Sequence, residues 1–264
     1  MPKEESPLSM QERQSLVCIR RLSFSPKQIF TKLIEHTRFS WRGAMSRNDC
    51  SPEAVSSWIV GNFPREQEYG DPFKVLVSTI LSQRTRDENT EEASRRLFSV
   101  YPDPQSLIDA KPEDLYDLIK ASGMYRQKAA RIINCARMIV ESFAGVVPDT
   151  LEELVTIPGV GRKTANIVLN VSFKKEALAV DTHVHRIANR LGWVKTKTPD
   201  DTEFALMKIL PPSIWGPVNG SMVEFGREIC RPIGPKCNLC GISQCCEYFS
   251  LVSEQTTERQ KQQK

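Results

Sequence analysis

Apolar residues recur at helical spacing along most of the chain, and residues that begin and end helices lie between these stretches. Ser51 suits a helix N-cap because its hydroxyl can accept a backbone N–H, and Pro52 suits the first turn because no N–H is needed there. The same pattern predicts helices over 51–59, 73–81, 87–100 with Asp87 as its cap, 112–119, 127–142, 151–155, 163–171, 181–191 and 221–230.

Alternation of apolar and polar residues, the pattern of a half-buried strand, is not convincing anywhere in the sequence. The predicted fold class is therefore all-α, with about ten short helices joined by short loops. In the helix over 127–142, Ala130, Ile133, Ala136 and Val140 are predicted to share a face. Residues 1–50 have weak periodicity and scattered basic residues, and are predicted to be a disordered extension, either a dispensable tail or a basic arm. Residues 249–264 are predicted to be a polar tail.

Charge is distributed unevenly along the chain, whose formal net charge is only +4. Residues 120–197 hold 13 Lys and Arg against 6 Asp and Glu, whereas residues 64–119 hold 7 against 12. The central segment is thus the basic one, which permits a nucleic-acid partner. No run approaches the ~20 apolar residues that a spanning helix needs, and the first ten residues do not suit an export signal. We expect an intracellular protein, in the cytoplasm of a prokaryote or otherwise in the nucleus.

A glycine-rich turn occurs at Ile157-Pro158-Gly159-Val160-Gly161, between a short predicted helix and an apolar one. Two glycines two positions apart permit a tight hairpin with unobstructed backbone N–H groups, and the following helix offers its free N-terminal donors. The segment lacks the spacer of a Walker loop and the preceding strand of a dinucleotide-binding motif. It suits a phosphate cradle, or equally a tight turn between packed helices.

Cysteines are concentrated near the C-terminal end, where five of the eight lie between Cys230 and Cys246. Such clustering favours metal binding over a disulfide framework, and we take Cys18, Cys50 and Cys135 as ordinary thiols. Cys230, Cys237, Cys240 and Cys246 are separated by six, two and five residues. That spacing by itself leaves zinc and an iron–sulfur cluster open.

The motifs IPGVGRKTAN, VDTH, LSQRTRD and GMYRQKAARI, together with the cysteine spacing, resemble the endonuclease III branch of the helix-hairpin-helix DNA glycosylase superfamily. The resemblance runs from about residue 71 to residue 248. It implies two helical lobes flanking a cleft: a helical barrel with the helix-hairpin-helix motif over 71–184, and a discontinuous iron–sulfur cluster lobe of 51–70 and 185–248. It also implies a [4Fe–4S] cluster on the four cysteines, with Cys246 preferred to Cys245 as the fourth ligand.

Lys163 matches the Schiff-base lysine of that family, and Asp181 matches its catalytic aspartate. A lysine nucleophile must be neutral, and desolvation, the helix N-terminus and the adjacent Arg162 would all favour the neutral amine. Asp181 can stabilise positive charge growing at C1′ of the sugar, and it also suits the N-cap of the helix that follows it. His183 and His185, two positions apart, do not share a helix face, so packing or phosphate contact is favoured over a metal pair.

Candidate DNA contacts follow from the same resemblance. Either Gln83 or Arg84 would fill the gap that a flipped base leaves, and Met124 would wedge into the opposite strand. The remaining candidates are phosphate contacts from the hairpin and from the first cysteine loop, namely Gly159, Gly161, Arg162, Thr164, Arg231 and Lys236.

The function implied is a bifunctional DNA glycosylase and abasic-site lyase that acts as a monomer on double-stranded DNA. The expected substrates are damaged bases, with oxidised pyrimidines first among them, and abasic sites. A monofunctional glycosylase such as those of the adenine-removing branch lacks the lysine and usually carries an additional C-terminal domain. A non-enzymatic helix-hairpin-helix DNA-binding protein would not need Lys163 and Asp181 together. Incision of lesion DNA by the purified protein separates these classes.

Overall fold

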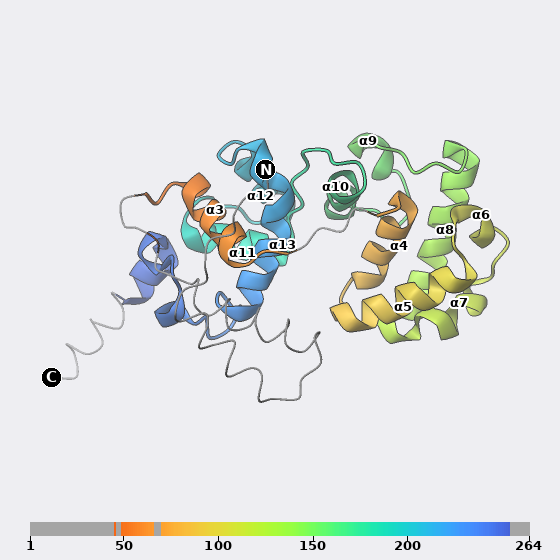
Figure 1. Ribbon diagram of the computed structural model, residues 1–264, viewed down its shortest axis with the longest axis horizontal. Coiled ribbons are helices and arrows are strands. Elements are labelled where there is room, and N and C mark those ends of the chain that lie inside the picture. Colours follow the sequence, from red (N-terminus) through yellow and green to blue (C-terminus); the bar gives the residue numbers. More distant parts are fainter. Residues whose placement is uncertain (1–44, 46–48, 66–69, 254–264) are drawn as a thin grey trace, which may run out of the picture. The chain divides into compact units, whose positions relative to one another are not determined.

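The computed structural model describes residue 45, residues 49–65 and residues 70–253 (Figure 1). Within them every regular element is helical and no strand occurs, which confirms the predicted all-α class. The α-helices are α3 (Pro52–Asn62), α4 (Pro72–Ser82), α5 (Asp87–Val100), α6 (Pro104–Leu107), α7 (Pro112–Ile119), α8 (Tyr125–Phe143), α9 (Leu151–Leu154), α10 (Arg162–Val171), α11 (Thr182–Leu191), α12 (Pro199–Met207) and α13 (Pro212–Glu228). Three 3₁₀-helices cover Lys120–Ser122, Cys237–Leu239 and Ser243–Cys245.

Side-chain caps explain where several helices begin. The Ser51 hydroxyl accepts the Ala54 N–H at 3.2 Å, so the predicted cap of α3 is confirmed. The prediction for Asp87 is wrong: Asp87 is the first residue of α5, Arg86 stands at the N-cap, and Arg86 makes no side-chain cap bond. The Asp87 carboxylate accepts a hydrogen bond from Arg227 at 2.9 Å instead. The local pattern predicted that this carboxylate caps the helix, but it bonds to a residue 140 positions away in the sequence.

Two elements differ from the predicted helices for physical reasons. α13 begins at Pro212 rather than at residue 221. The sequence did not indicate its first part because Gly216, Pro217 and Gly220, which weaken a helical pattern, lie there. The predicted face of α8 is confirmed in part: Ile133 and Ala136 belong to the core, whereas Ala130 and Val140 are half-buried and Ile132 and Ile139 are buried in their place. The helices α6 and α12 were not predicted.

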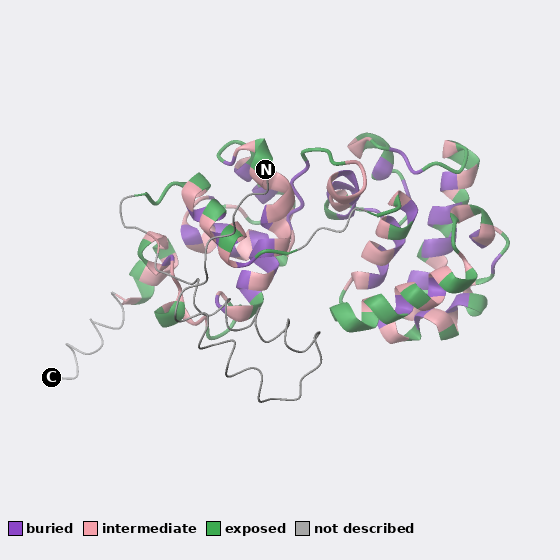
Figure 2. Ribbon diagram, viewed as in Figure 1, coloured by how far each residue is buried: buried purple, intermediate pink, exposed green. Residues whose placement is uncertain are grey.

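Buried side chains form two hydrophobic clusters, and Figure 2 shows their residues along the helices. One cluster draws its residues from Phe73 to Ala177, over α4 to α10. The other combines Val55, Ile59 and Phe63 of the α3 segment with residues from Leu178 to Ile242. The division of the chain into a barrel of 71–184 and a second lobe remains a prediction. No described helix is long and apolar enough to cross a membrane. The predicted extension lies largely outside the described residues. The predicted tail begins too early: residues 249–253 are helical and Phe249 lines a pocket, and the rest of the tail lies outside the described residues.

Candidate active site and cysteine pocket

The glycine-rich turn joins α9 to α10 as a hairpin. Gly159 has a positive φ of +85°, a conformation that residues with a Cβ rarely adopt. Gly161 is the N-cap of α10 and contributes no capping side chain. The first turn of α10 therefore begins at a residue that leaves the approach to its backbone N–H groups open, as expected for a phosphate cradle.

Lys163 is the second residue of α10, and its side chain is exposed to solvent. The expected desolvation of this amine is therefore not present in the free protein. The expected influence of Arg162 is also reduced, because Arg162 Nη2 donates to Glu203 Oε1 at 2.6 Å and Nε donates to Oε2 at 3.4 Å. The hydrogen bond to Glu203 raises the pKa of the Arg162 guanidinium. Lys163 itself stands in the first turn of α10, as the sequence predicts.

Asp181 is the N-cap of α11, as predicted. Its Oδ1 accepts the backbone N–H of His183 at 2.8 Å and that of Val184 at 3.0 Å. Oδ2 has no hydrogen bond within the described part of the chain, and the residue is half-buried. The carboxylate is thus held in place by one oxygen while the other stays available to a substrate.

A charge network links these two residues to α5 and α13. Hydrogen bonding to Arg227 is the largest cause that lowers the pKa of Asp87, with further contributions from the charges of Arg227, Arg65 and Lys163. The hydrogen bond to Asp87 likewise raises the pKa of Arg227, with the charge of Asp181 contributing. Lys163 and Asp181 thus interact with the same Asp87–Arg227 pair. Asp87 was predicted only as a cap, although it ends the LSQRTRD motif.

The two histidines of α11 have separate partners. Burial is the main cause that lowers the pKa of His183, and its Nδ1 lies 3.2 Å from Nη2 of Arg186. The Nδ1 of His185 lies 2.6 Å from the Thr202 hydroxyl of α12. These contacts agree with the predicted packing role.

The candidate DNA-inserting residues lie in two loops, which we call the Gln83 loop (residues 83–85) and the Gly123 loop (residues 123–124). Arg84 and Met124 both have left-handed backbone conformations, with φ of +54° and +46°, and both side chains are exposed. The Gln83 side-chain oxygen accepts a hydrogen bond from Arg131 at 3.2 Å. Arg84 makes no hydrogen bond or ion pair within the described residues, so it is the freer of the two gap-filling candidates.

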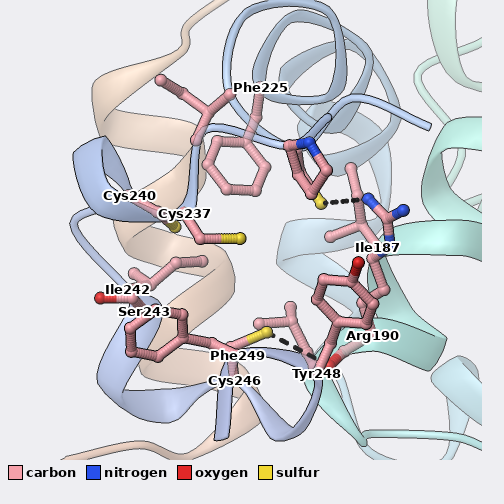
Figure 3. Close-up of a pocket in the computed structure, with 14 residues that line it drawn as sticks. Ile187, Arg190, Phe225, Cys237, Cys240, Ile242, Ser243, Cys246, Tyr248 and Phe249 are labelled. Atoms are coloured by element: carbon pink, nitrogen blue, oxygen red, sulfur yellow. Dashed lines mark hydrogen bonds between the residues drawn. The ribbon is translucent and has the colours of Figure 1, made fainter. Parts of the chain in front are cut away.

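Cys230, Cys237, Cys240 and Cys246 line one pocket (Figure 3), together with apolar and aromatic side chains such as Phe225 and Tyr248. Burial raises the pKa of Cys240 to about 12 and also raises the pKa of Cys237 and of Cys246. Thiolates in such surroundings need a compensating positive charge, which bound metal would supply. Soft sulfur donors in an apolar pocket suit zinc or an iron–sulfur cluster. Among the described residues, no three potential ligands stand close enough to hold a single metal ion.

The pocket is bordered by Arg190 of α11, which connects it to the first cysteine loop. Arg190 Nη1 donates to the Cys230 sulfur at 3.4 Å and to the Arg231 carbonyl at 2.6 Å. Of the phosphate-contact candidates on this loop, Arg231 is exposed and Lys236 is half-buried.

A disulfide joins Cys50 to Cys245, and it corrects the prediction that Cys50 is an ordinary thiol. The two residues are 195 positions apart, so no spacing in the sequence indicates the pairing. The disulfide occupies Cys245, whereas Cys246 is a free thiol that lines the pocket. This arrangement favours Cys246 as the fourth ligand.

Comparisons with known proteins agree with one another. Residues 77–212 match the family described as "HhH-GPD superfamily base excision DNA repair protein". The chain is 66% identical to Endonuclease III of Thermotoga maritima over 197 residues, covering 75% of this chain and 92% of that one. It is 36% identical to Endonuclease III of Rickettsia conorii, covering 69% and 86% of the two chains. Among solved structures, a trapped Endonuclease III–DNA covalent intermediate matches with a TM-score of 0.70 and 34% identity, covering 75% of this chain and 95% of that chain.

Proposed function

Because this chain belongs to the HhH-GPD superfamily of base excision DNA repair proteins, we propose that it is a bifunctional DNA glycosylase and abasic-site lyase. The observation that carries the proposal is that Lys163 is exposed in the first turn of α10, directly after the glycine hairpin, and that Asp181 caps α11 through Oδ1 alone. Its partner is double-stranded DNA, and oxidised pyrimidines are the proposed substrates. We propose that it acts as a monomer inside the cell.

The proposed reaction begins with a damaged nucleotide flipped out of the duplex, since its sugar is unreachable within the stack. The Lys163 amine attacks C1′, a C–N bond to the enzyme forms, and the bond to the base breaks. The free Oδ2 of Asp181 stabilises the positive charge that grows at C1′ and assists proton transfer. The lysine and the opened sugar then form an imine, and loss of a proton from C2′ expels the 3′ phosphate by β-elimination. Entry of the nucleotide would also remove water from around the Lys163 amine.

The four pocket cysteines, Cys230, Cys237, Cys240 and Cys246, would hold a [4Fe–4S] cluster in this proposal. When bound, the cluster supplies a rigid, charged anchor for the loop that carries Arg231 and Lys236. Those two residues, with Gly159 and Gly161 of the hairpin, would contact phosphates. Thr164 is the third residue of α10 and is buried, so its side chain is not placed for the predicted phosphate contact. Arg162 is engaged by Glu203 and would contribute less to phosphate binding.

The test is covalent trapping with borohydride on a duplex that contains an abasic site or an oxidised pyrimidine. The unmodified protein should become attached to the DNA, since borohydride reduces the imine. Lys163→Gln keeps length and polarity but has no nucleophilic amine, so both trapping and strand cleavage should disappear while lesion binding survives. Lys197→Gln, an equal loss of charge at another exposed lysine, is the matched control and should trap normally.

Asp181→Asn retains an oxygen that can cap α11, so folding and binding should persist while base release slows by roughly 10²–10⁴-fold. Trapping by Lys163→Gln at the unmodified rate would assign the nucleophile to another amine. Base release without trapping by the unmodified protein would make the enzyme a monofunctional glycosylase. Absence of both activities on every lesion tested would favour a DNA-binding protein.

A further inference from the structure

Lys128 is a buried lysine that the proposed reaction does not use. It lies in the first turns of α8 and is only 1% exposed. Its Nζ donates three hydrogen bonds, each of 2.7 Å, to the carbonyl oxygens of Leu81 and Ser122 and to the hydroxyl oxygen of Thr85. An ammonium group has three N–H donors, so the site satisfies all of them.

The three oxygens belong to the bases of the two candidate DNA-inserting loops. Leu81 lies in α4 just before the Gln83 loop, and Thr85 is the last residue of that loop. Ser122 directly precedes the Gly123 loop. The Thr85 hydroxyl also donates to the Ser122 carbonyl, so the two loop bases contact each other directly as well as through Lys128. One buried cation thereby connects segments that are about 40 residues apart in the sequence.

Each loop carries one residue that needs such support. Arg84 and Met124 adopt left-handed conformations without being glycines, and such conformations persist only where the surrounding structure enforces them. Both side chains are exposed, whereas the atoms that fix the loops are buried beneath them. The exposed side chains of Arg84 and Met124 thus project from two loops that the same buried hydrogen bonds hold together.

The charge on Lys128 is part of that support. Burial is the main cause that lowers the pKa of Lys128 to about 8, with Arg131 adding to the effect. The three oxygen acceptors oppose this change, because they bond best to the charged form. An apolar side chain of similar length would fill the space without the desolvation cost of an ammonium. It would also remove the Lys128 donor from the Leu81 carbonyl and the Thr85 hydroxyl, and one of the two donors from the Ser122 carbonyl.

We propose that Lys128 is a positioning residue for DNA engagement, which holds the Gln83 loop and the Gly123 loop in one fixed arrangement so that Arg84 and Met124 enter the duplex together. This rests on the proposed function, in which a nucleotide leaves the duplex. Arg84 would occupy the gap and bond to the unpaired base opposite, while Met124 would separate neighbouring bases. Loosening either loop would then slow flipping without changing the chemistry at Lys163.

The experiment compares two substrates that differ in whether flipping is needed. The first is a duplex with one oxidised pyrimidine and a 2-aminopurine next to it, whose fluorescence rises when the bases unstack. The second is a single-stranded oligonucleotide with an abasic site, on which borohydride trapping reports the chemistry of Lys163 alone. Lys128→Met should slow both the fluorescence change and base release from the duplex by roughly 10²-fold, and trapping on the single strand should keep the unmodified rate.

Thr85 provides a milder variant in case Lys128→Met does not fold. Thr85→Val has nearly the same shape but loses the hydroxyl that joins Lys128 to Ser122, so it should show the same selective loss to a smaller degree. Thr85→Ser keeps the hydroxyl and should restore the duplex rate. Ile139→Ala, a buried change on the same helix and outside these contacts, is the control for lost stability and should slow neither substrate selectively.

Unchanged duplex rates in Lys128→Met and Thr85→Val would overturn the proposal. An equal fall on both substrates would also overturn it, because Lys128 would then act on the chemistry or on the fold in general. Failure of the unmodified protein to trap on a duplex that contains an abasic site would contradict the proposed lyase function instead, so the two failures are distinguishable.

Discussion

The ion pair between Arg162 and Glu203 joins the start of α10 to α12, and removing its two partners should have unequal costs. The Glu203 side chain is only 4% exposed, whereas that of Arg162 is 30% exposed. Arg162 also lies over the Phe204 ring, 4.8 Å from its centroid. Removing Arg162 therefore leaves a buried charge without a partner, whereas removing Glu203 leaves a charge that can reach water.

Replacing Arg162 by Met leaves a carboxylate buried without its cation. Breaking a buried pair in this way typically costs about 3–5 kcal/mol. Replacing Glu203 by Gln keeps an acceptor and leaves a guanidinium that can reach water, so the expected loss is about 1.5 kcal/mol, the scale of a hydrogen bond to a charged group. The double change to Met at both positions should be close to neutral, since neither charge is then buried.

Urea unfolding at 25 °C and pH 7 of the three variants and the unmodified protein gives these free energies directly. Equal losses in the two single variants, or a larger loss in Glu203→Gln, would refute the reasoning that exposure of the orphaned partner decides the cost.

Three further outcomes follow from the structure. Cys246→Ser should lower the iron content of the purified protein, whereas Cys245→Ser should leave the iron bound and remove only the disulfide. The reverse result would make Cys245 the fourth ligand, and colourless protein with one zinc would exclude the iron–sulfur cluster. Asp87→Asn should cost less than about 1 kcal/mol at pH 7 because the Asp87–Arg227 pair is half-exposed. Hydrogen bonding to Arg227 lowers the pKa of Asp87, so its contribution exists above the unfolded value near 4 and is lost as pH falls through the folded one. Urea unfolding at pH 7 and pH 3 should therefore give a smaller difference between variant and unmodified protein at pH 3, and a larger one would contradict this. A chain that begins at Met45 should fold and cut lesion DNA, since the Met45 N–H already bonds to the Gly241 carbonyl at 3.0 Å; loss of cooperative unfolding would show that residues 1–44 are needed.

The sequence by itself determined the features that depend on neighbours in the chain. Ser51 caps α3 and Asp181 caps α11 because an N-cap needs only a side-chain oxygen and the next turn of backbone. The hairpin at Gly159 and Gly161 was readable for the same reason, since a positive φ is a local requirement that glycine meets. The helical class and the motifs that indicate the family also follow from local spacing.

Tertiary structure alone decided which distant groups meet. It paired Asp87 with Arg227, 140 residues away, and so drew the carboxylate from the predicted cap into the charge network around Lys163. It joined Cys50 to Cys245, and it buried Lys128 beneath two loops. In each case the partner is brought by the packing of helices, whose relative positions depend on the buried apolar surface of the whole fold. A charged residue in the sequence does not reveal whether water or a distant oxygen will satisfy it.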